Sequence, residues 1–396
     1  MKKAIGFVVM SLMAGFALAF PGATSAQTAP QTRQPIKVSQ GWLESQGAKL
    51  AFSSTNKMTA NGKAAMQQQH VITVPNWSGS FTFQGTTFPY TMIGNNPPQR
   101  GGTTLIPTQL IPISFFFDEF VDQNGNNIVI DVSPIITPTL TSPNFIPQPY
   151  TSGFTQYGDA VQRAEFFNVQ SPGWHNLLLE PRQLTPVQVE VPFGSSIVLE
   201  TPSGIIFALI DFNFMISQLN TIVQLEPLNP GALAIALTHN ALFYSGTPNN
   251  CCTLGFHTAF ETSQVGPFIN VQTFAFATWA DEGIFVNPQI ADVLALSHEI
   301  SEWFNDPFVD NIVPEWTDPN GDGGCQNDLE VGDPVEGLPN PAFPVTIGGF
   351  TYHPQILALL PWFSRQTPNT MSIGGAFSYP NTTTLTSPSQ PCPTTP

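Results

Sequence analysis

The chain has 396 residues with 27 acidic side chains against 11 lysines and arginines, so its formal net charge is −16 at pH 7. Binding to nucleic acid needs a basic surface, and this charge balance therefore excludes nucleic acid as an expected partner. The length suits one large domain or two, and 39 prolines and 31 glycines predict many turns and short strands.

The N-terminal segment 1–26 has the pattern of a secretory signal peptide. Lys2 and Lys3 precede an apolar run, which small residues follow up to Ala26. We expect cleavage after Ala26, with Ala19 as the alternative. The apolar run is short for a membrane span, and no later run is long enough. The sequence therefore predicts an exported mature protein, extracellular or periplasmic, without a membrane span.

Segments 27–69 and 70–245 differ in pattern. The first is polar and is predicted to be a weakly ordered lead-in or a pro-segment. The second has short apolar runs between turn residues, which is typical of a β-rich region. Its predicted strands lie at 71–74, 81–83, 86–92, 105–117, 115–121, 128–132, 187–191, 196–200, 205–210 and 232–244, its predicted helices at 156–168 and 211–223, and an extended loop at 133–150. Prolines in 105–117 favour an edge strand or a bent one.

The segment 246–380 contains a helix predicted over 287–307. Asn287 fits the N-cap and Pro288 the first helical position, while Pro307 ends the helix. Its apolar side, which we expect to be packed, consists of Ile290, Val293, Leu294, Ser297, Ile300, Ser301 and Phe304. A strand over 270–279 is expected at the centre of a sheet close to this helix, and 232–244 is the candidate edge strand.

The opposite side of the helix carries a metal-binding pattern. His298 and Glu302 are four residues apart, so their side chains reach one small ion. A catalytic zinc takes three protein ligands and keeps a fourth position for water. Glu299 lies beside this pair and is predicted to act as the general base. The alternative is an amphipathic helix with three ordinary polar residues on its exposed side.

Acidic residues recur after the helix, and one of them is expected to be the third metal ligand. Glu330 is the first candidate and Asp333 the second, because both lie about thirty residues past the helix, a distance from which a loop can return.

Four cysteines in an exported chain predict disulfides. Neighbouring cysteines rarely bond to each other, so we expect either Cys251 or Cys252 to pair with Cys325 and the other to pair with Cys392. Ligation of zinc by these thiolates is the alternative.

A second candidate ion is Ca²⁺. Asp318, Asn320 and Asp322 stand at alternate positions and resemble the first half of a calcium-binding loop. A complete loop has Glu at its twelfth position, where this chain has Leu329, and Glu330 is one residue late. A solvated turn is the alternative.

The motifs S-H-E-I-S-E-W-F-N-D-P at 297–307 and C-Q-N-D-L-E-V-G-D-P at 325–334 resemble secreted zincin-like bacterial proteins of uncharacterised activity. More distantly they resemble the phosphate-induced, EXORDIUM-like proteins of plant cell walls. Those families also carry an upstream Cys followed by Gly-x-His, matched here by Cys252 and His257. The resemblance covers about 250–365 and implies a shared scaffold for a metal site.

The remaining histidines are weighed by their surroundings. His257 is a candidate zinc ligand, a donor to a developing negative charge, or a structural hydrogen-bonding group. Tyr352 and His353 are candidate donors to a tetrahedral intermediate. His70, His175 and His239 lack a supporting cluster and are predicted to be structural.

Together these patterns predict an α+β fold, in which a β-rich part is packed with a zincin-like helical metal-site region, and a Ser/Thr/Pro-rich tail at 381–396. A layered α/β fold of zincin type is the alternative. The predicted function is a secreted zinc-dependent peptidase, in which zinc-activated water attacks a peptide carbonyl. The alternatives are a non-catalytic protein that binds a cell-wall or cell-surface ligand, and a calcium-stabilised adhesion protein.

Overall fold

The computed structural model describes residues 32–46, 51–52, 71–265, 267–287, 289–319 and 324–393, which belong to one compact unit. The expected signal peptide and most of the expected lead-in lie outside the described residues. No helix among the described residues combines the length and the apolar composition that crossing a membrane requires.

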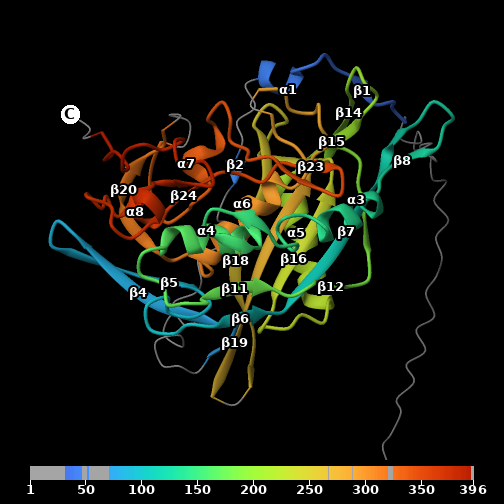
Figure 1. Ribbon diagram of the computed structural model, residues 1–396. Coiled ribbons are helices and arrows are strands. Elements are labelled where there is room, and N and C mark those ends of the chain that lie inside the picture. Colours follow the sequence, from blue (N-terminus) through green and yellow to red (C-terminus); the bar gives the residue numbers. More distant parts are fainter. Residues whose placement is uncertain are drawn as a thin grey trace, which may run out of the picture. The chain divides into compact units, whose positions relative to one another are not determined.

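The fold is α+β, as the sequence predicts. Its main element is a mixed 13-stranded sheet (Figure 1). In spatial order its main path is β1 (Ile36–Lys37), β14 (Ser196–Glu200), β15 (Ile206–Asp211), β17 (Ala241–Tyr244), β18 (Cys251–Val265), β19 (Phe268–Trp279), β16 (Leu233–His239), β7 (Thr108–Val121) and β12 (Arg182–Gln183). Four further strands pair beside this path: β13 (Val187–Val191) and β8 (Asn127–Ile130) with β7, β2 (Ala51–Phe52) with β18, and β3 (Val71–Ile72) with β19.

Shorter strand pairs and the helices complete the unit. The pairs are β4 (Asn76–Phe83) with β5 (Thr86–Ile93), β6 (Thr103–Ile106) with β11 (His175–Leu178), β9 (Gln148–Tyr150) with β10 (Gly153–Thr155), β20 (Ile312–Thr317) with β21 (Cys325–Asp328), β22 (Val345–Ile347) with β23 (Phe350–Tyr352), and β24 (Leu357–Ala358) with β25 (Ser378–Tyr379). The helices are α1 (Trp42–Ser45), α3 (Ser133–Leu140), α4 (Tyr157–Glu165), α5 (Phe212–Leu225), α6 (Leu294–Asn305), α7 (Asp333–Glu336), α8 (Leu360–Phe363) and the 3₁₀ turn η1 (Ile373–Gly375).

The β18–β19 hairpin separates two different surfaces, because successive side chains of a strand point to opposite faces. On the face toward α6 the hairpin carries small residues, among them Gly255, Ala275 and Ala277. These allow α6 to approach the sheet closely. The alternate positions carry aromatic side chains such as Phe256 and Phe276, which pack with α5 in a separate core on the other face.

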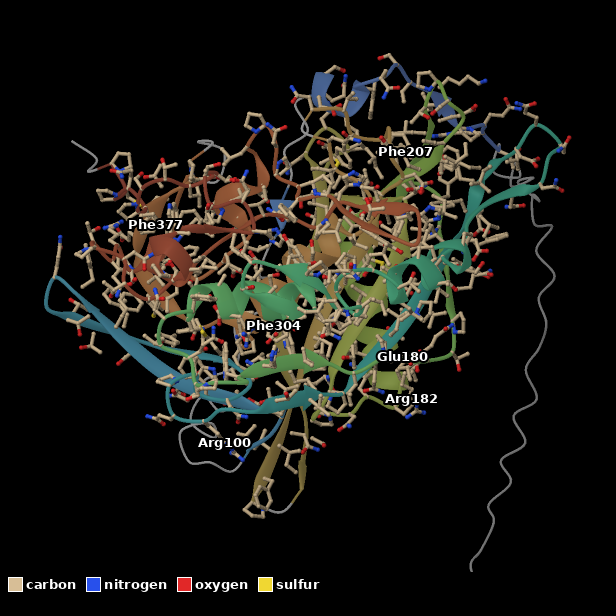
Figure 2. All side chains as sticks on the ribbon, viewed as in Figure 1. Arg100, Glu180, Arg182, Phe207, Phe304 and Phe377 are labelled. Atoms are coloured by element: carbon tan, nitrogen blue, oxygen red, sulfur yellow. A yellow bond between two sulfur atoms is a disulfide. The ribbon has the colours of Figure 1, made fainter. Side chains whose placement is uncertain are left out.

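Helix α6 is buried on every side, with all twelve of its residues inaccessible or nearly so. It packs against β18 and β19 on one side and against α4 on another. Phe304 lies in this helix–helix contact (Figure 2), where a Cβ on Gly158 of α4 would stand 2.6 Å from its ring. The contact therefore needs glycine at position 158. Polar side chains on α6 consequently face protein atoms rather than water.

Most elements follow the predicted pattern. The 81–83 and 86–92 strands form the β4–β5 hairpin around Gln84-Gly85, and β7 and β8 flank the turn at Asn124-Gly125. The predicted helices correspond to α4 and α5, and Asp211 caps α5 by accepting a hydrogen bond from Phe214 N.

Two predicted strands form but do not lie at an edge of the sheet, and one predicted loop contains a helix. The 105–117 segment, expected as an edge strand or a bent one, is not at an edge, because β7 pairs with β16 on one side and with β12 and β13 on the other. The 232–244 segment is also interior, and it divides into β16 and β17 at Asn240, which has a φ of 48°. The 133–150 segment contains α3, whose start is stabilised by Asp131 through its hydrogen bonds with Ser133. Pro134, the second residue of this helix, is compatible with the first turn, where a backbone N–H has no partner within the helix.

The helix predicted over 287–307 is correct at its C-terminus and wrong at its N-terminus. It begins at Leu294, seven residues after the predicted N-cap, and Pro288 lies outside the described residues. Asp292 adopts a left-handed conformation with a φ of 44° and forms an isolated bridge with Ala280. This tertiary contact replaces the first turns of the predicted helix.

The predicted disulfide pairing is also wrong. Cys251 bonds to its neighbour Cys252, and Cys325 bonds to Cys392 with 5.5 Å between their Cα atoms. The second disulfide attaches the C-terminal tail to β21, so it does not connect the acidic segment to the strand that carries His257. Because all four cysteines of the chain are paired, no thiol is left to bind zinc.

Candidate metal centre

Six ionisable side chains meet between α6 and the sheet. Helix α6 presents three of them, β18 presents one, and the chain after β21 contributes two, the second at the start of α7. We call this group the His–carboxylate cluster: His257, His298, Glu299, Glu302, Glu330 and Asp333. All six are buried, and the most exposed side chain, that of Asp333, is 9% accessible.

The imidazole of His298 is held in one tautomer. Its Nδ1 lies 2.6 Å from Oε1 of Gln355, while Nε2 of Gln355 donates to the carbonyl of Gly332 at 2.8 Å. The amide orientation is thereby fixed, with its oxygen toward the imidazole. Nδ1 of His298 therefore carries a proton and donates a hydrogen bond to Oε1 of Gln355. Nε2 then faces Oε1 of Glu302 at 3.0 Å and Oδ1 of Asp333 at 3.6 Å. Three atoms with lone pairs converge there, which requires a proton or a metal ion among them.

The imidazole of His257 has the same arrangement with its nitrogens exchanged. Nε2 lies 3.1 Å from the carbonyl oxygen of Asp306, which can only accept, so Nε2 carries the proton. Nδ1 faces Oε2 of Glu299 at 3.3 Å and Oε2 of Glu302 at 3.4 Å. A second group of three ligand atoms therefore lies beside the first.

Glu302 belongs to both groups. Its Oε1 faces His298 and also accepts a hydrogen bond from the backbone N–H of Gly332 at 3.1 Å, while its Oε2 faces His257. Each of the two groups, His298–Glu302–Asp333 and His257–Glu299–Glu302, has ligand atoms within 4.8 Å of one another and could hold a metal ion.

Two glycines leave room for this arrangement. A Cβ on Gly332 would lie 2.3 Å from Nδ1 of His298, and one on Gly255 would lie 2.5 Å from Oε1 of Glu299. Side-chain carbons do not approach this closely, so any larger residue would displace the imidazole or the carboxylate. Glycine at these positions is explained by the cluster.

Burial and charge shift the ionisation of the cluster. Burial alone would lower the pKa of His298, but the carboxylate of Glu302 outweighs it and raises the pKa to about 9. Burial likewise opposes protonation of His257, but Glu330, Glu299 and Glu302 hold its pKa well above the usual value. The protein therefore favours positive charge at both imidazoles.

The carboxyl groups respond in opposite directions. Burial raises the pKa of Glu299 to about 7, although its hydrogen bond with His257 opposes the shift. Burial and the charge of Glu302 raise the pKa values of Glu330 and Asp333 well above their usual range. Glu302 is also buried, but the nearby imidazoles, His298 above all, keep its pKa below the usual value. Glu302 is therefore the carboxylate that stays ionised.

The two candidates for a third ligand lie on different sides of the cluster. Asp333, the second choice, lies with His298 and Glu302, whereas Glu330 lies on the side of His257, with Oε2 3.9 Å from Nε2. The start of α7 places Asp333 next to His298. Among the described residues, neither carboxylate oxygen of Glu330 has a hydrogen-bond partner.

His257, for which the sequence leaves three roles open, lies at the centre of the site. Tyr352 and His353 are directed elsewhere. The hydroxyl of Tyr352 donates to the carbonyl of Pro138 at 2.9 Å, and Nδ1 of His353 lies 2.6 Å from Oδ2 of Asp292. These two groups are therefore hydrogen-bonded to partners outside the cluster. Their expected role as donors to a tetrahedral intermediate does not agree with this arrangement.

The other predicted sites lie outside the cluster. His175 pairs with Asp159 at 2.7 Å and His239 with Asp281 at 3.0 Å, in agreement with structural roles. Asp318 is buried. The remaining calcium-loop candidates, Asn320 and Asp322, and also His70, lie outside the described residues.

Gln355 and Asp306 are functional residues that the sequence did not reveal. Gln355 lies 57 residues after His298 and follows His353 by two positions, so it carries no local signal. Asp306 acts through its backbone carbonyl, which no motif marks. Gly332, between Glu330 and Asp333, and Gly255, two residues before His257, were the available signs of a close backbone approach.

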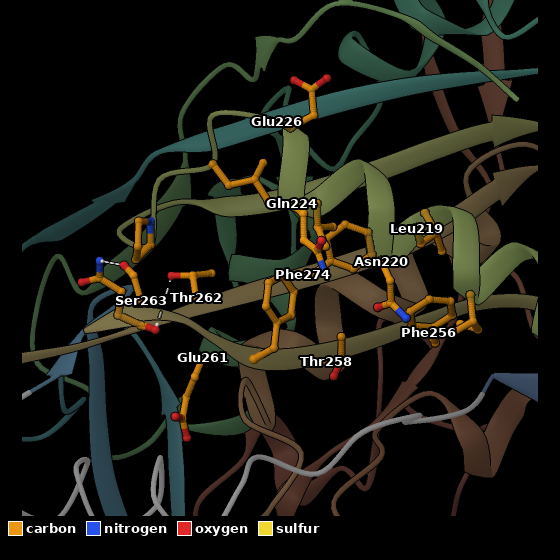
Figure 3. A pocket seen from close by; sticks show the side chains of 16 residues that line it. Leu219, Asn220, Gln224, Glu226, Phe256, Thr258, Glu261, Thr262, Ser263 and Phe274 are labelled. Atoms are coloured by element: carbon orange, nitrogen blue, oxygen red, sulfur yellow. Dashed lines mark hydrogen bonds between the residues drawn. The ribbon is translucent and has the colours of Figure 1, made fainter. Parts of the chain in front are cut away.

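A cavity of about 630 Å³ lies on the other face of the sheet (Figure 3). It is bounded by α5 and by Phe256 and Thr258 of β18. His257 stands between these two residues in the strand and so points to the opposite face. The cavity therefore does not open onto the cluster.

Comparison with protein-family models, with curated proteins and with solved structures finds no match to this chain. The geometry of the cluster therefore carries the functional proposal.

Proposed function

We propose that the protein is an exported zinc-dependent peptidase in which His298, Glu302 and Asp333 hold the ion. The observation that carries this proposal is the orientation of His298. Oε1 of Gln355 lies 2.6 Å from Nδ1 and so keeps the proton on this nitrogen. The opposite nitrogen, Nε2, points at two carboxylate oxygens. A metal-ligating histidine has this same arrangement, because its second nitrogen donates to a neighbouring acceptor.

The donor set fits zinc. One imidazole nitrogen and two carboxylate oxygens are ordinary zinc ligands, and three protein ligands leave a position open, as in catalytic sites. When bound, zinc supplies a Lewis acid, which is the chemistry that amide hydrolysis needs.

Glu299 is the proton acceptor in this proposal. His257 contacts its Oε2 at 3.3 Å and so fixes the orientation of the carboxylate. Its Oε1 has no hydrogen-bond partner among the described residues and can therefore accept a proton. Gly332 holds Glu302 in place through its backbone N–H, so the ligand is oriented before the ion arrives.

Export is supported by two features. The N-terminal segment has the pattern of a signal peptide, and both disulfides are of the kind that persists in oxidising compartments.

A second candidate function is a non-catalytic protein that binds a cell-surface ligand and uses the metal for stability. The burial of the cluster favours it, because Glu299 is inaccessible and a substrate carbonyl must reach the proton acceptor. The 630 Å³ cavity on the far face would then be a candidate ligand site.

The test is zinc content by mass spectrometry, followed by an assay with a library of quenched fluorescent peptides. We expect zinc in the purified protein, its loss in Glu302→Ala, and turnover that disappears in Glu299→Gln. The exposed Glu190→Gln on β13 is the matched control and should retain both.

Zinc binding without turnover of any peptide would support the second candidate. Protein that takes up no zinc when it is offered would overturn both candidates.

A further inference from the structure

The His257 side of the cluster has the geometry of a second ion site. Its Nδ1 lies 3.3 Å from Oε2 of Glu299 and 3.4 Å from Oε2 of Glu302. Its other nitrogen, Nε2, donates a hydrogen bond to the carbonyl oxygen of Asp306. In the neutral imidazole, Nδ1 therefore carries a lone pair that points at two oxygens.

These distances differ from those of the direct histidine–carboxylate pairs in the same chain. His175 lies 2.7 Å from Asp159, His353 lies 2.6 Å from Asp292, and His239 lies 3.0 Å from Asp281. Such values are typical of charge-assisted hydrogen bonds. Two ligands each about 2.1 Å from a tetrahedral ion are instead about 3.4 Å apart. The spacing around Nδ1 of His257 therefore fits ligand atoms arranged about a cation. The 3.3 Å contact with Oε2 of Glu299 is a long hydrogen bond when Nδ1 carries a proton, and a cation would take the place of that proton.

The carboxylate of Glu302 is oriented as a bridge. One oxygen faces His298 and the other faces His257, so each can bind a different ion. The cluster has four carboxylates and two imidazoles. If all four carboxylates are ionised and both imidazoles are neutral, two divalent ions balance their charge, whereas one ion leaves two carboxylates to be neutralised by protons. The composition of the cluster is therefore compatible with two ions.

Two buried carboxylates of the cluster have oxygens without a hydrogen-bond partner among the described residues. Glu299 is inaccessible and its Oε1 has no hydrogen-bond partner among the described residues. The same holds for both oxygens of Glu330, whose side chain is 6% exposed and lies 3.9 Å from Nε2 of His257. Buried polar atoms are normally satisfied, so atoms without partners indicate an ion or water between them.

We propose that the protein holds a second divalent cation between His257, Glu299 and Glu302, which makes the centre dinuclear with Glu302 as the bridge. This inference rests on the proposed function for the ion at His298. It changes the roles of two residues. Glu299 becomes a ligand of the second ion, and Glu330, neither of whose oxygens has a hydrogen-bond partner among the described residues, becomes the proton acceptor. Dinuclear centres of this type stabilise both the attacking and the leaving atom in hydrolysis.

Metal stoichiometry tests the second site. The full-length mature protein is saturated with zinc, separated from free metal and analysed by mass spectrometry for metal against sulfur. We expect two zinc ions per chain in the wild type, one in His257→Ala, one in His298→Ala and none held tightly in Glu302→Ala. His175→Asn is the matched histidine control and should retain two.

Glu299→Gln separates this inference from the proposed function. If Glu299 is a ligand, the variant falls from two ions to one. If Glu299 is only the proton acceptor, the variant keeps the wild-type count and loses turnover. A wild type that binds one ion, with His257→Ala unchanged, would overturn the second site and leave the proposed function standing. A wild type that binds none overturns both.

A second measurement tests the bridge in the wild type itself and so does not depend on the folding of a variant. Mn²⁺ replaces zinc in the wild type, and electron paramagnetic resonance then detects magnetic coupling between two bridged ions. We expect a coupled spectrum in the wild type and the uncoupled six-line spectrum of a single ion in His257→Ala. An uncoupled spectrum in fully loaded wild type would overturn the bridge.

Discussion

Gln355 holds His298 from the side opposite to the carboxylates, with Oε1 of the amide 2.6 Å from Nδ1 of the imidazole. The same amide donates to the carbonyl of Gly332 and so connects the helix to the chain segment that brings Asp333. One side chain therefore sets both the tautomer of His298 and the position of the loop opposite it.

Replacing Gln355 by Leu should weaken zinc binding without removing any ligand. The imidazole would lose the acceptor that keeps its proton on Nδ1, and such losses typically reduce metal affinity about 10- to 100-fold. Competition with a zinc-chelating dye measures the change. Gln272→Leu is the matched control, because Gln272 is also buried but donates to the backbone carbonyls of Ala232 and Thr273, away from the cluster. Equal affinities in the two variants would contradict the assigned role.

Replacing Gly332 by Ala should displace His298. The added Cβ would lie 2.3 Å from Nδ1 of the imidazole, while the backbone φ of −84° suits any residue, so the effect is steric. We expect zinc affinity to fall at least as far as in the Gln355 variant, as the same dye competition would show. Gly231→Ala is the control, since its Cβ would meet its nearest neighbour at an ordinary 3.5 Å. Unchanged affinity in the Gly332 variant would exclude this packing.

Zinc should stabilise the protein more at pH 8 than at pH 5. Burial and the charge of Glu302 raise the pKa values of Glu330 and Asp333, so protons compete with the ion as the pH falls. At free zinc about 1,000 times the Kd, stabilisation is about 4 kcal/mol. Thermal unfolding with zinc and with a chelator measures it at both pH values. The same zinc effect in His298→Ala would indicate binding elsewhere.

Glu165, at the end of α4, should make stability fall as the pH rises. Burial raises the pKa of this carboxyl from 4.5 to about 8. The folded chain therefore holds a proton that the unfolded chain releases between these values, and the free energy of unfolding decreases across that window. A pKa that differs by one between the folded and the unfolded chain corresponds to about 1.4 kcal/mol. Glu165→Gln removes the ionisation and should flatten the decline.

Urea unfolding at pH 5 and pH 8 measures this effect, with the exposed Glu190→Gln as control. If wild type and Glu165→Gln lose the same stability between the two pH values, the raised pKa of Glu165 is excluded.

The C-terminal end of α6, the helix that carries His298, was predictable because it depends on local chemistry. Pro307 restricts the residue before it, and α6 ends at Asn305. The N-terminal end was not, because Asp292 is held by a bridge to Ala280 and by a hydrogen bond from His353 N. Contacts between residues this far apart in sequence override a local capping signal.

The cluster residues that share one helix were likewise predictable from spacing, whereas their partners from other elements were not. His298, Glu299 and Glu302 share a helix, and helical geometry alone brings them together. His257 comes from β18, a strand of 15 residues that was not predicted, since Gly255 and the paired cysteines interrupt its pattern. The disulfide pairing failed for a related reason, because four cysteines allow three connectivities and spacing does not choose among them.

The complete burial of α6 has a consequence for sequence variation. A helix at the surface tolerates substitutions on its outer side, so tolerant and intolerant positions alternate every three or four residues. Every side chain of α6 is enclosed, by the sheet, by α4 or by the cluster. A saturation scan of Leu294–Asn305 should therefore give one unbroken block of sensitive positions. Natural substitutions should accumulate in the segments around the helix rather than within it.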